Sequence, residues 1–224
     1  MKKTLYHGSA DVIKYPQYGK GKVRNDYGLG FYCTENLELA LEWSVNLNRD
    51  GFANEYEIET DDLKILYLED GKHNILHWLT ILLQNRVFNI KGPLANEAKN
   101  YLLENFSIPY REYDVIIGYR ADDSYFAFAQ DFLNGAISYQ QLSRAMKFGQ
   151  LGEQFVLISE KAFSKISFIK THFGDAKIYF DKKNARDKKA RDDYYDLKKN
   201  KRNKGDLFIN YIIDEEIKDG DSRL

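Results

Sequence analysis

Short apolar runs, bounded by glycine and polar residues, predict most of the strands of this chain. The runs are rich in β-branched, aromatic and leucine residues, which fit a pleated and half-buried surface. The strands that we expect from them cover residues 4–7, 30–34, 56–59, 63–68, 113–118, 154–158 and 166–170. A loop with two glycines and two tyrosines, residues 16–27, separates the first two strands.

Apolar residues at helical spacing fill the segments between these strands. Leucine and isoleucine recur on one helix face at positions 75, 76, 79, 82 and 83, which predicts an amphipathic helix over residues 73–86. Ser138 and Gln141 have the spacing of a capping box and predict the start of a helix that reaches residue 147. Further helices are expected over residues 36–48, 94–105 and 125–133. The mixture of strands and helices predicts an α+β fold.

The composition of the chain is that of an ordinary globular protein. With 224 residues, 43% hydrophobic and 15% aromatic, the chain can bury one sizeable core, so we expect one domain with additions rather than two equal domains. Cys33 is the only cysteine, which excludes an intramolecular disulfide and a zinc site built from cysteines. Because no signal peptide or membrane-spanning stretch is recognisable, we expect a cytoplasmic protein without membrane attachment.

The net charge of −1 hides a basic segment near the end of the sequence. Residues 182–204 contain eleven Lys or Arg and four Asp, a local charge of +7. Because Tyr194 and Tyr195 are interleaved with the cations, this segment has the composition of an arm that contacts RNA or a partner protein. A solvated helix without a partner is the alternative, since charged tails are common and the aspartates weaken the field that a phosphate backbone would meet.

Two short segments carry the candidate chemistry. His7-Gly8-Ser9 follows the first strand and offers an imidazole, a backbone that a ligand can approach closely and a hydroxyl. The second segment has two glycines before an aromatic pair, and strand alternation sends Phe31 and Tyr32 to opposite faces, so that one ring can face a ligand. The alternative is structural: a satisfied core histidine, and glycines that shape an ordinary hairpin.

Other polar residues give weaker evidence for a binding site. His73 and His77 lie one helical turn apart, as two metal ligands can, but without a third ligand at suitable spacing we expect no metal site. Arg120 follows the strand that ends at residue 118 and can neutralise a pyrophosphate. Asp122 or Asp123 can hold a hydroxyl, although capping of the next helix also explains Asp123. The sequence has no Walker or dinucleotide-fold glycine motif, so a nucleotide would have to be bound in another fold.

The same two segments resemble those of a known superfamily. His7-Gly8-Ser9 and Gly30-Phe31-Tyr32 resemble the first two signatures of the ADP-ribosyltransferases, in the His-Tyr-Glu branch that includes the poly(ADP-ribose) polymerases. Together with the strand Asp114-Val115-Ile116-Ile117-Gly118, they are similar, more narrowly, to the bacterial DUF3990 family of toxin-like domains. The resemblance extends over about residues 4–169.

This resemblance implies a fold and a domain organisation. The expected fold is α+β, with a split β-sheet core of the ADP-ribosyltransferase type that carries helical insertions. Residues 1–181 would form the transferase-like domain, with the helical insertion at about 73–150. Residues 182–224 would then be a basic, helical C-terminal extension.

The resemblance also implies an activity. The chain would be an NAD-dependent mono-ADP-ribosyltransferase, a toxin of a toxin-antitoxin or defence module, which moves ADP-ribose from NAD to a protein or nucleic-acid acceptor and releases nicotinamide. An antitoxin protein is a further expected partner. His7 would bind the adenosine-ribose hydroxyl, Gly8 would bind the nicotinamide amide through its backbone, and Ser9 belongs to the same cofactor-binding set. Tyr32 and Trp43 would stack on the nicotinamide ring.

Two positions depart from the superfamily pattern. The resemblance places Gln154 at the catalytic position of a glutamate, and a neutral amide can hydrogen-bond the nicotinamide ribose but cannot act as a base. Glu153 would reach the same side of its strand only through a bulge or a register shift. Ala40 stands where the polymerases have a serine that binds the nicotinamide amide. A catalytically silent NAD-binding or protein-interaction module of the same fold, and an RNA-binding protein, are therefore the alternatives.

Overall fold

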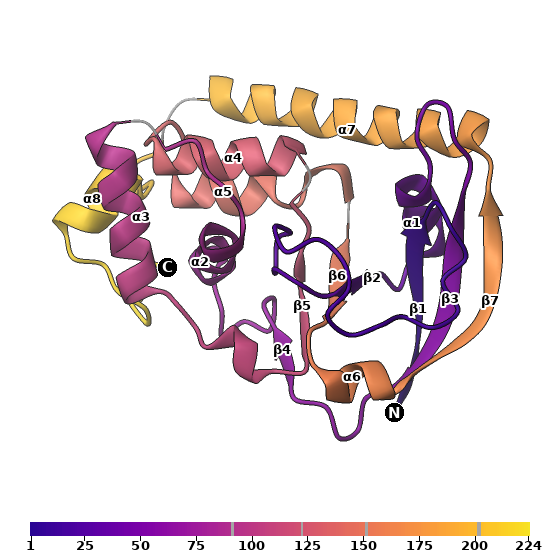
Figure 1. Ribbon diagram of the computed structural model, residues 1–224. Helices are drawn as coiled ribbons and strands as arrows, with labels where there is room; N and C mark the ends of the chain where they lie inside the picture. Colours follow the sequence, from indigo (N-terminus) through magenta and orange to yellow (C-terminus); the bar gives the residue numbers. More distant parts are fainter. Residues whose placement is uncertain (91, 122, 151, 201–202) are drawn as a thin grey trace.

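Two β-sheets lie side by side in the structure, a computed structural model that describes residues 1–90, 92–121, 123–150, 152–200 and 203–224 (Figure 1). The first sheet is antiparallel, in the order β1 (Lys2–Ser9), β3 (Gly51–Glu59) and β7 (Ile166–Gly174). The second has the order β2 (Phe31–Cys33), β6 (Glu153–Leu157), β5 (Val115–Tyr119) and β4 (Ile65–Tyr67). Among the strand pairs of the described residues, only β4 and β5 are parallel. Reciprocal backbone hydrogen bonds between Tyr6 and Thr34, of 2.8 and 2.9 Å, join the two sheets.

Helices cover the sheets on several sides (Figure 1). Helix α1 (Leu37–Ser44) packs on β1 and β3, and α6 (Glu160–Ser164) connects β6 to β7. The helices at the other end of the molecule are α2 (Ile75–Asn85), α3 (Pro93–Asn105), α4 (Asp123–Leu133), α5 (Tyr139–Ala145) and α8 (Ile209–Asp214). Helix α7 (Ala176–Lys199) runs along one side of the molecule and contacts α1, α4 and α5. Short 3-10 turns occur at Tyr110–Glu112 and Phe148–Gln150.

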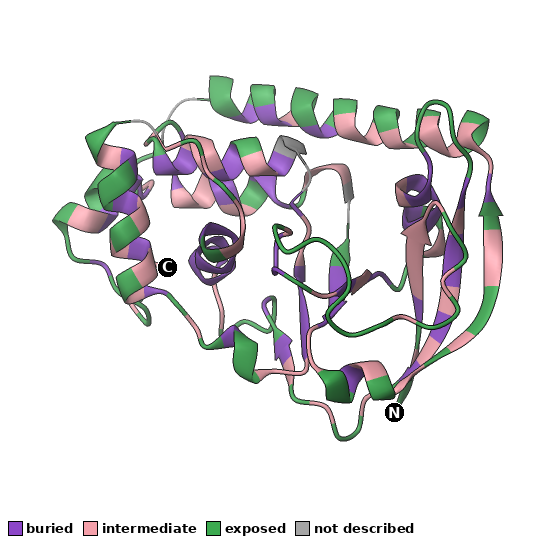
Figure 2. Ribbon diagram, in the orientation of Figure 1, coloured by how far each residue is buried: buried purple, intermediate pink, exposed green. Residues whose placement is uncertain are grey.

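The apolar side chains form two main clusters. The larger one surrounds α2, whose ribbon is almost entirely buried in Figure 2 and whose Trp78 is fully buried. The second cluster lies between the two sheets and contains Leu5, Phe31, Tyr56 and Phe155. Burial of these side chains on both faces of the sheets positions the ends of β1, β2 and β6 relative to one another.

The pattern of apolar positions located these elements well. The α+β prediction is confirmed, and so is the capping box of α5, in which Gln141 N donates to Ser138 Oγ and Ser138 N donates to Gln141 Oε1. The helix predicted over residues 36–48 ends at Ser44. Strands β3 and β7 are longer than predicted, because they pair with each other from Gly51–Gly174 to Ile58–Ile166 and each residue in the ladder gains a partner.

Within the described residues, the basic segment packs against the rest of the protein. Residues 182–199 belong to α7, which buries Ala190, Tyr194 and Leu197 against the helices beneath it. Several of its cations pair with acidic residues of other elements, as in Lys182–Glu38, Arg186–Glu42 and Lys198–Asp131. The segment is therefore helical with one packed face, and contact of its cations with RNA or an antitoxin protein stays a prediction. Lys201 and Arg202 lie outside the described residues.

No helix within the described ranges combines the length and the apolar character that crossing a bilayer requires.

Candidate functional site

A cavity of about 920 Å³ opens where the ends of β1, β2 and β6 meet α1 and α7. The loop of residues 10–30 between β1 and β2 forms another of its walls. The six residues that the sequence suggested as a site all line this cavity: His7, Gly8, Ser9, Tyr32, Trp43 and Gln154. The fold thus brings together side chains that are up to 147 positions apart in the sequence.

His7 is held in one orientation by its neighbours. Its Nδ1 lies 2.7 Å from the carbonyl oxygen of Tyr32, and because a carbonyl only accepts, Nδ1 carries the proton. The ring stacks on Phe31 with centroids 4.3 Å apart. Burial lowers the pKa of His7, which favours the neutral imidazole. A neutral ring with a protonated Nδ1 leaves Nε2 as a hydrogen-bond acceptor at the cavity.

Gly8 and Ser9 have clear structural roles at the end of β1. A Cβ on Gly8 would overlap the carbonyl oxygen of Ala40, so glycine allows α1 to lie directly against the strand. The Ser9 hydroxyl donates to the carbonyl oxygen of Asp11 over 2.5 Å and accepts from the amide of Asn54 over 3.0 Å. Asn54 is fully buried and also accepts from the backbone N–H of Ile13. These bonds fix the start of the loop that borders the cavity.

The two aromatic residues at the cavity have different surroundings. The Tyr32 hydroxyl donates to the carbonyl oxygen of Gly28 over 2.6 Å and accepts from the backbone N–H of Tyr27 over 3.1 Å. Trp43 carries the guanidinium of Arg120 over its ring, with Cζ 3.7 Å from the centroid. Arg120 therefore lies at the cavity, as its position after β5 suggested. Asp122 lies outside the described residues, as does the side chain of Asp123.

Gln154 has a buried carboxylate as its neighbour. The Gln154 side chain is 5% exposed, and its Nε2 lies 3.3 Å from Oδ2 of Asp26, which is also 5% exposed. Oε1 of Gln154 is buried without a hydrogen-bond partner among the described residues. Asp26 also accepts from the backbone N–H of Ala121 over 2.9 Å and from Arg86 over 3.3 Å. Burial raises the pKa of Asp26, whereas the Ala121 N–H and the two arginines, Arg86 and Arg120, act in the opposite direction.

Sequence reasoning missed Asp26 as a site residue. It lies in the irregular loop between β1 and β2, where no motif or periodicity marks it. Its partners Ala121 and Gln154 are 95 and 128 positions away. Only the tertiary fold makes it part of the site.

Glu153 is on the other face of β6. The ladder between β5 and β6 runs in unbroken register from Val115–Leu157 to Tyr119–Glu153, so no bulge brings Glu153 to the side of Gln154. Burial and the neighbouring Glu69 carboxylate raise the pKa of Glu153. The alternative in which Glu153 replaces Gln154 through a register shift is therefore wrong for this structure.

Cations predominate around the cavity. The lining contains the basic residues Lys20, Lys22, Arg49, Arg86, Arg120, Lys183, Arg186 and Arg191, and the acidic residues Asp26, Glu42 and Asp187. Helix α7 supplies part of this wall and is attached to α1 by a bidentate ion pair, in which Arg186 Nε and Nη2 donate to Glu42 over 2.9 and 2.8 Å. A cavity with this charge favours an anionic ligand such as a phosphate or pyrophosphate.

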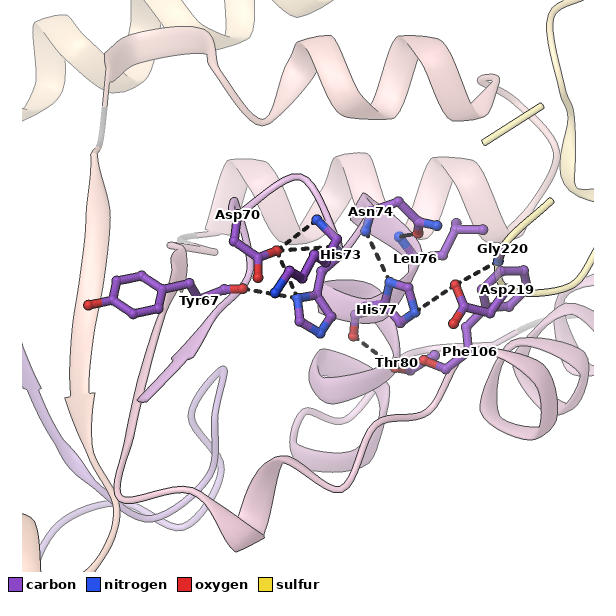
Figure 3. A network of polar contacts seen from close by, with 11 residues as sticks. Tyr67, Asp70, His73, Asn74, Leu76, His77, Thr80, Phe106, Asp219 and Gly220 are labelled. Carbon is purple, nitrogen blue, oxygen red and sulfur yellow. Dashed lines mark hydrogen bonds and ion pairs between the residues drawn. The ribbon is translucent and has the colours of Figure 1, made fainter. Parts of the chain in front are cut away.

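His73, just before α2, and His77 on α2 belong to a network of polar contacts (Figure 3), and the helix predicted from residue 73 begins at Ile75. His73 Nδ1 lies 3.0 Å from Asp70, and His77 Nε2 lies 3.1 Å from Asp219 near the C-terminus. His77 Nδ1 accepts the backbone N–H of Asn74 over 3.0 Å and so completes the capping box of α2. Among the described residues, no group of three metal-ligating side chains occurs.

This network predicts a loss of stability in acid. Neutral His77 accepts at Nδ1 and donates at Nε2, and burial lowers its pKa in the folded protein. Protonation would set a second donor against the Asn74 N–H. Because the unfolded state then binds more protons, the free energy of unfolding should fall as the pH falls below about 6.5. His7, which is half-buried and whose pKa is also lowered by desolvation, contributes in the same direction.

Urea unfolding of the His77→Gln variant between pH 7.5 and pH 5 measures the His77 contribution. Glutamine can accept from the Asn74 N–H and donate to Asp219, as in a usual capping box, but it does not titrate. We expect a weaker pH dependence than in the wild type, with the His7 contribution remaining. An unchanged slope would show that His77 does not sense pH in the fold.

Comparison with known proteins gives one match. Searches of the curated proteins and of the solved structures found none. A family profile described as "Protein of unknown function (DUF3990)" matches residues 3–168, from β1 into β7. The matched residues include every sequence-suggested site residue and Asp26, whereas α7 lies beyond them. The chain belongs to the DUF3990 family.

Proposed function

We propose that this protein is an NAD-dependent mono-ADP-ribosyltransferase whose β-sheets form the split core of that superfamily. The observation that carries the proposal is the convergence of His7, Tyr32, Trp43 and Gln154 on one cavity. The resemblance to the superfamily rests on short sequence motifs, and it requires that the motif residues line one cavity. A toxin of a toxin-antitoxin or defence module is the proposed biological setting.

The cavity residues suit the parts of NAD. His7 presents Nε2 as an acceptor for a hydroxyl of the adenosine ribose, and the backbone of Gly8 is at the cavity for the nicotinamide amide. Tyr32 and Trp43 supply aromatic surface for the cationic nicotinamide ring, although Arg120 would have to leave the Trp43 face that it covers. The surplus of cations in the lining favours the pyrophosphate.

In the proposed reaction, the bond between the ribose C1′ and the nicotinamide nitrogen breaks through an oxocarbenium-like state. Nicotinamide leaves with the bonding electron pair. A nucleophile of a protein or nucleic-acid acceptor then forms the new bond to C1′ and loses its proton to solvent or to a base of the acceptor. Gln154 holds the nicotinamide ribose but takes no proton, because its amide is not basic.

A catalytically silent NAD-binding or protein-interaction module is the second candidate. The observation that favours it is the neutral Gln154 on β6, with the nearest glutamate, Glu153, on the opposite face of the strand. Such a module would bind NAD without releasing nicotinamide.

The test is incubation of the full chain with labelled NAD and a cell extract. Free nicotinamide and label in the protein and RNA fractions are measured separately, for the wild type, for His7→Ala and for His172→Ala as a matched control. His172 lies on β7, pairs with Glu55 and does not line the cavity. We expect the wild type and the control to release nicotinamide. His7→Ala should release it about 100-fold more slowly, because the ribose is misplaced.

The outcomes separate the two candidates. Label in one fraction, dependent on His7, identifies the acceptor class and supports the transferase. NAD binding without nicotinamide release contradicts the transferase and favours the silent module. Absence of both binding and release contradicts the transferase and a silent NAD-binding module, and favours a protein-interaction module.

A further inference from the structure

The least satisfied polar group at the cavity belongs to Gln154. Its side chain is 5% exposed and its Oε1 is buried with no donor among the described residues, although its Nε2 is paired with Asp26. Buried polar atoms are nearly always hydrogen-bonded, so an orphaned acceptor on a residue that lines a cavity points to a donor from a ligand.

We propose that Asp26 is a positioning residue that orients the Gln154 amide, so that Oε1 faces the cavity and accepts a hydrogen bond from a ribose hydroxyl of the ligand. The identity of the ligand as NAD, and of the hydroxyl as one of its nicotinamide ribose, rests on the proposed function. The orientation of the amide rests on the contacts of Asp26 alone.

The chemistry of the pair fixes the orientation. An ionised carboxylate only accepts hydrogen bonds, whereas an amide has one end that donates and one that accepts. The NH2 end of Gln154 therefore lies against Asp26 Oδ2. The reverse orientation would set the amide oxygen against a carboxylate oxygen and point the NH2 group away from it. Asp26 thus decides that the site presents an acceptor to the ligand.

Asp26 is itself held in place from several sides. Its Oδ2 accepts from the backbone N–H of Ala121. Ala121 follows Arg120, the first residue after β5. Its Oδ1 accepts from Arg86 just after α2, and the Arg86 guanidinium lies over the ring of Phe126 with Cζ 5.0 Å from the centroid. A carboxylate fixed by separate elements is a firm support for a neighbouring amide.

The arrangement also determines the kind of ligand group that fits. A hydroxyl that donates to Oε1 satisfies the orphaned acceptor, whereas a ligand without that hydroxyl leaves it unpaired. Because the charge lies on Asp26 and not on Gln154, the contact with the ribose is a neutral hydrogen bond. The site should therefore bind a ligand that has this hydroxyl more tightly than the same ligand without it.

The first test compares NAD with its analogue that lacks the 2′-hydroxyl of the nicotinamide ribose, by calorimetry on the full chain. We expect the wild type to bind NAD about tenfold more tightly than the analogue. Gln154→Met has no acceptor and should lose this preference. Asp26→Asn keeps the size of the side chain but lets the amide turn, so it should also lose most of the preference.

Asp187→Asn is the matched control. Asp187 also lines the cavity, but it pairs with Arg191 on α7 and does not contact Gln154. We expect this variant to keep the wild-type preference for NAD. Circular dichroism and melting curves of each variant show whether it is folded, and a folded Asp26→Asn variant that keeps the full preference would overturn the proposal.

A second readout needs no ligand. The side-chain NH2 resonances of Gln154, assigned by their loss in Gln154→Met, should shift as Asp26 is protonated at low pH. Burial raises the pKa of Asp26, and the charged groups that act against this are Arg86 and Arg120. The shift should be absent in Asp26→Asn. Resonances that do not respond to Asp26 in the wild type would contradict the orienting role.

The two readouts separate the proposal from the proposed function. If NAD does not bind, the transferase assignment and the ribose contact fail together, and the NH2 resonances still decide whether Asp26 orients Gln154. If NAD binds and is cleaved but the analogue binds equally well, the transferase stands and the role of Gln154 as ribose acceptor is wrong.

Discussion

Replacement of Glu42 by alanine should lower the free energy of unfolding by about 3 kcal/mol, because it leaves Arg186 without its carboxylate. The Glu42 side chain is 3% exposed and that of Arg186 is 27% exposed, so water only partly replaces the lost partner. The pair joins α1 to α7, and Arg186 Nη1 also donates to the carbonyl oxygen of Gly149 over 2.9 Å. Urea unfolding of the full chain measures the loss.

The same two helices supply the control. Glu38 and Lys182 form a second ion pair one turn away, with an N–O distance of 2.7 Å, but both side chains are about half exposed. Because such surface pairs contribute little, Glu38→Ala should cost less than about 1 kcal/mol. Equal losses in the two variants would show that burial does not decide the strength of these pairs.

A double variant separates the ion pair from the packing. Glu42→Leu combined with Arg186→Met removes both charges and keeps apolar volume, and such replacements of buried pairs are often nearly neutral. We expect the double variant to be more stable than Glu42→Ala. A double variant as unstable as the single one would mean that the side chains of residues 42 and 186 matter through something other than the unpaired charge.

The attachment of α7 bears on the site, because this helix forms part of the cavity wall. Lys183, Arg186 and Arg191 line the cavity from α7. Loosening of the helix in Glu42→Ala should therefore also weaken the binding of an anionic ligand, whereas Glu38→Ala should leave it nearly unchanged.

Local patterns predicted the elements because each depends on neighbours in sequence. The helix face of α2 and the capping box of α5 involve residues three or four positions apart, and these predictions are confirmed. The positions of β1, β2, β5 and β6 were also close to the observed ones. The ends of β3 and β7 were missed, because the length of a strand is set by its partner.

The site was predicted only where motifs marked it. His7 and Tyr32 stand in recognisable segments, and both line the cavity. Asp26 and the wall formed by α7 had no such signal, because their places depend on contacts across more than 90 positions of sequence. The packing of the basic segment was not predicted for a related reason: three of its cations pair with acidic residues of other elements, and composition does not reveal such pairs.

The packing of α1 on the sheet explains why residue 8 is a glycine, in addition to the proposed contact of Gly8 with the ligand. The resemblance assigns its backbone to the nicotinamide amide, and the structure places it beneath α1 with no room for a side chain. Gly51 on the neighbouring strand β3 is in a similar position, since a Cβ there would overlap the carbonyl oxygen of Ser44. Two glycines thus allow α1 to approach the sheet, and α1 in turn carries Trp43 to the cavity.

Substitution of Gly8 by alanine should therefore lower the free energy of unfolding by about 3 kcal/mol. The added methyl group would meet the backbone of Ala40 and lie 3.0 Å from the backbone nitrogen of Ser44, and a helix backbone cannot turn aside as a side chain can. For a chain of this size, the loss corresponds to a decrease of about 6–12 °C in Tm. Thermal melting followed by circular dichroism measures it.

Two further variants test the cause of this loss. Gly71→Ala adds a methyl group with nothing within 4 Å, at a φ of +78°, and should cost only about 1 kcal/mol through backbone strain. Ala40→Gly should not rescue Gly8→Ala, because the overlap is with the carbonyl oxygen of Ala40 and not with its methyl group. Rescue by Ala40→Gly would show that side-chain packing, rather than the approach of the two backbones, makes glycine necessary at position 8.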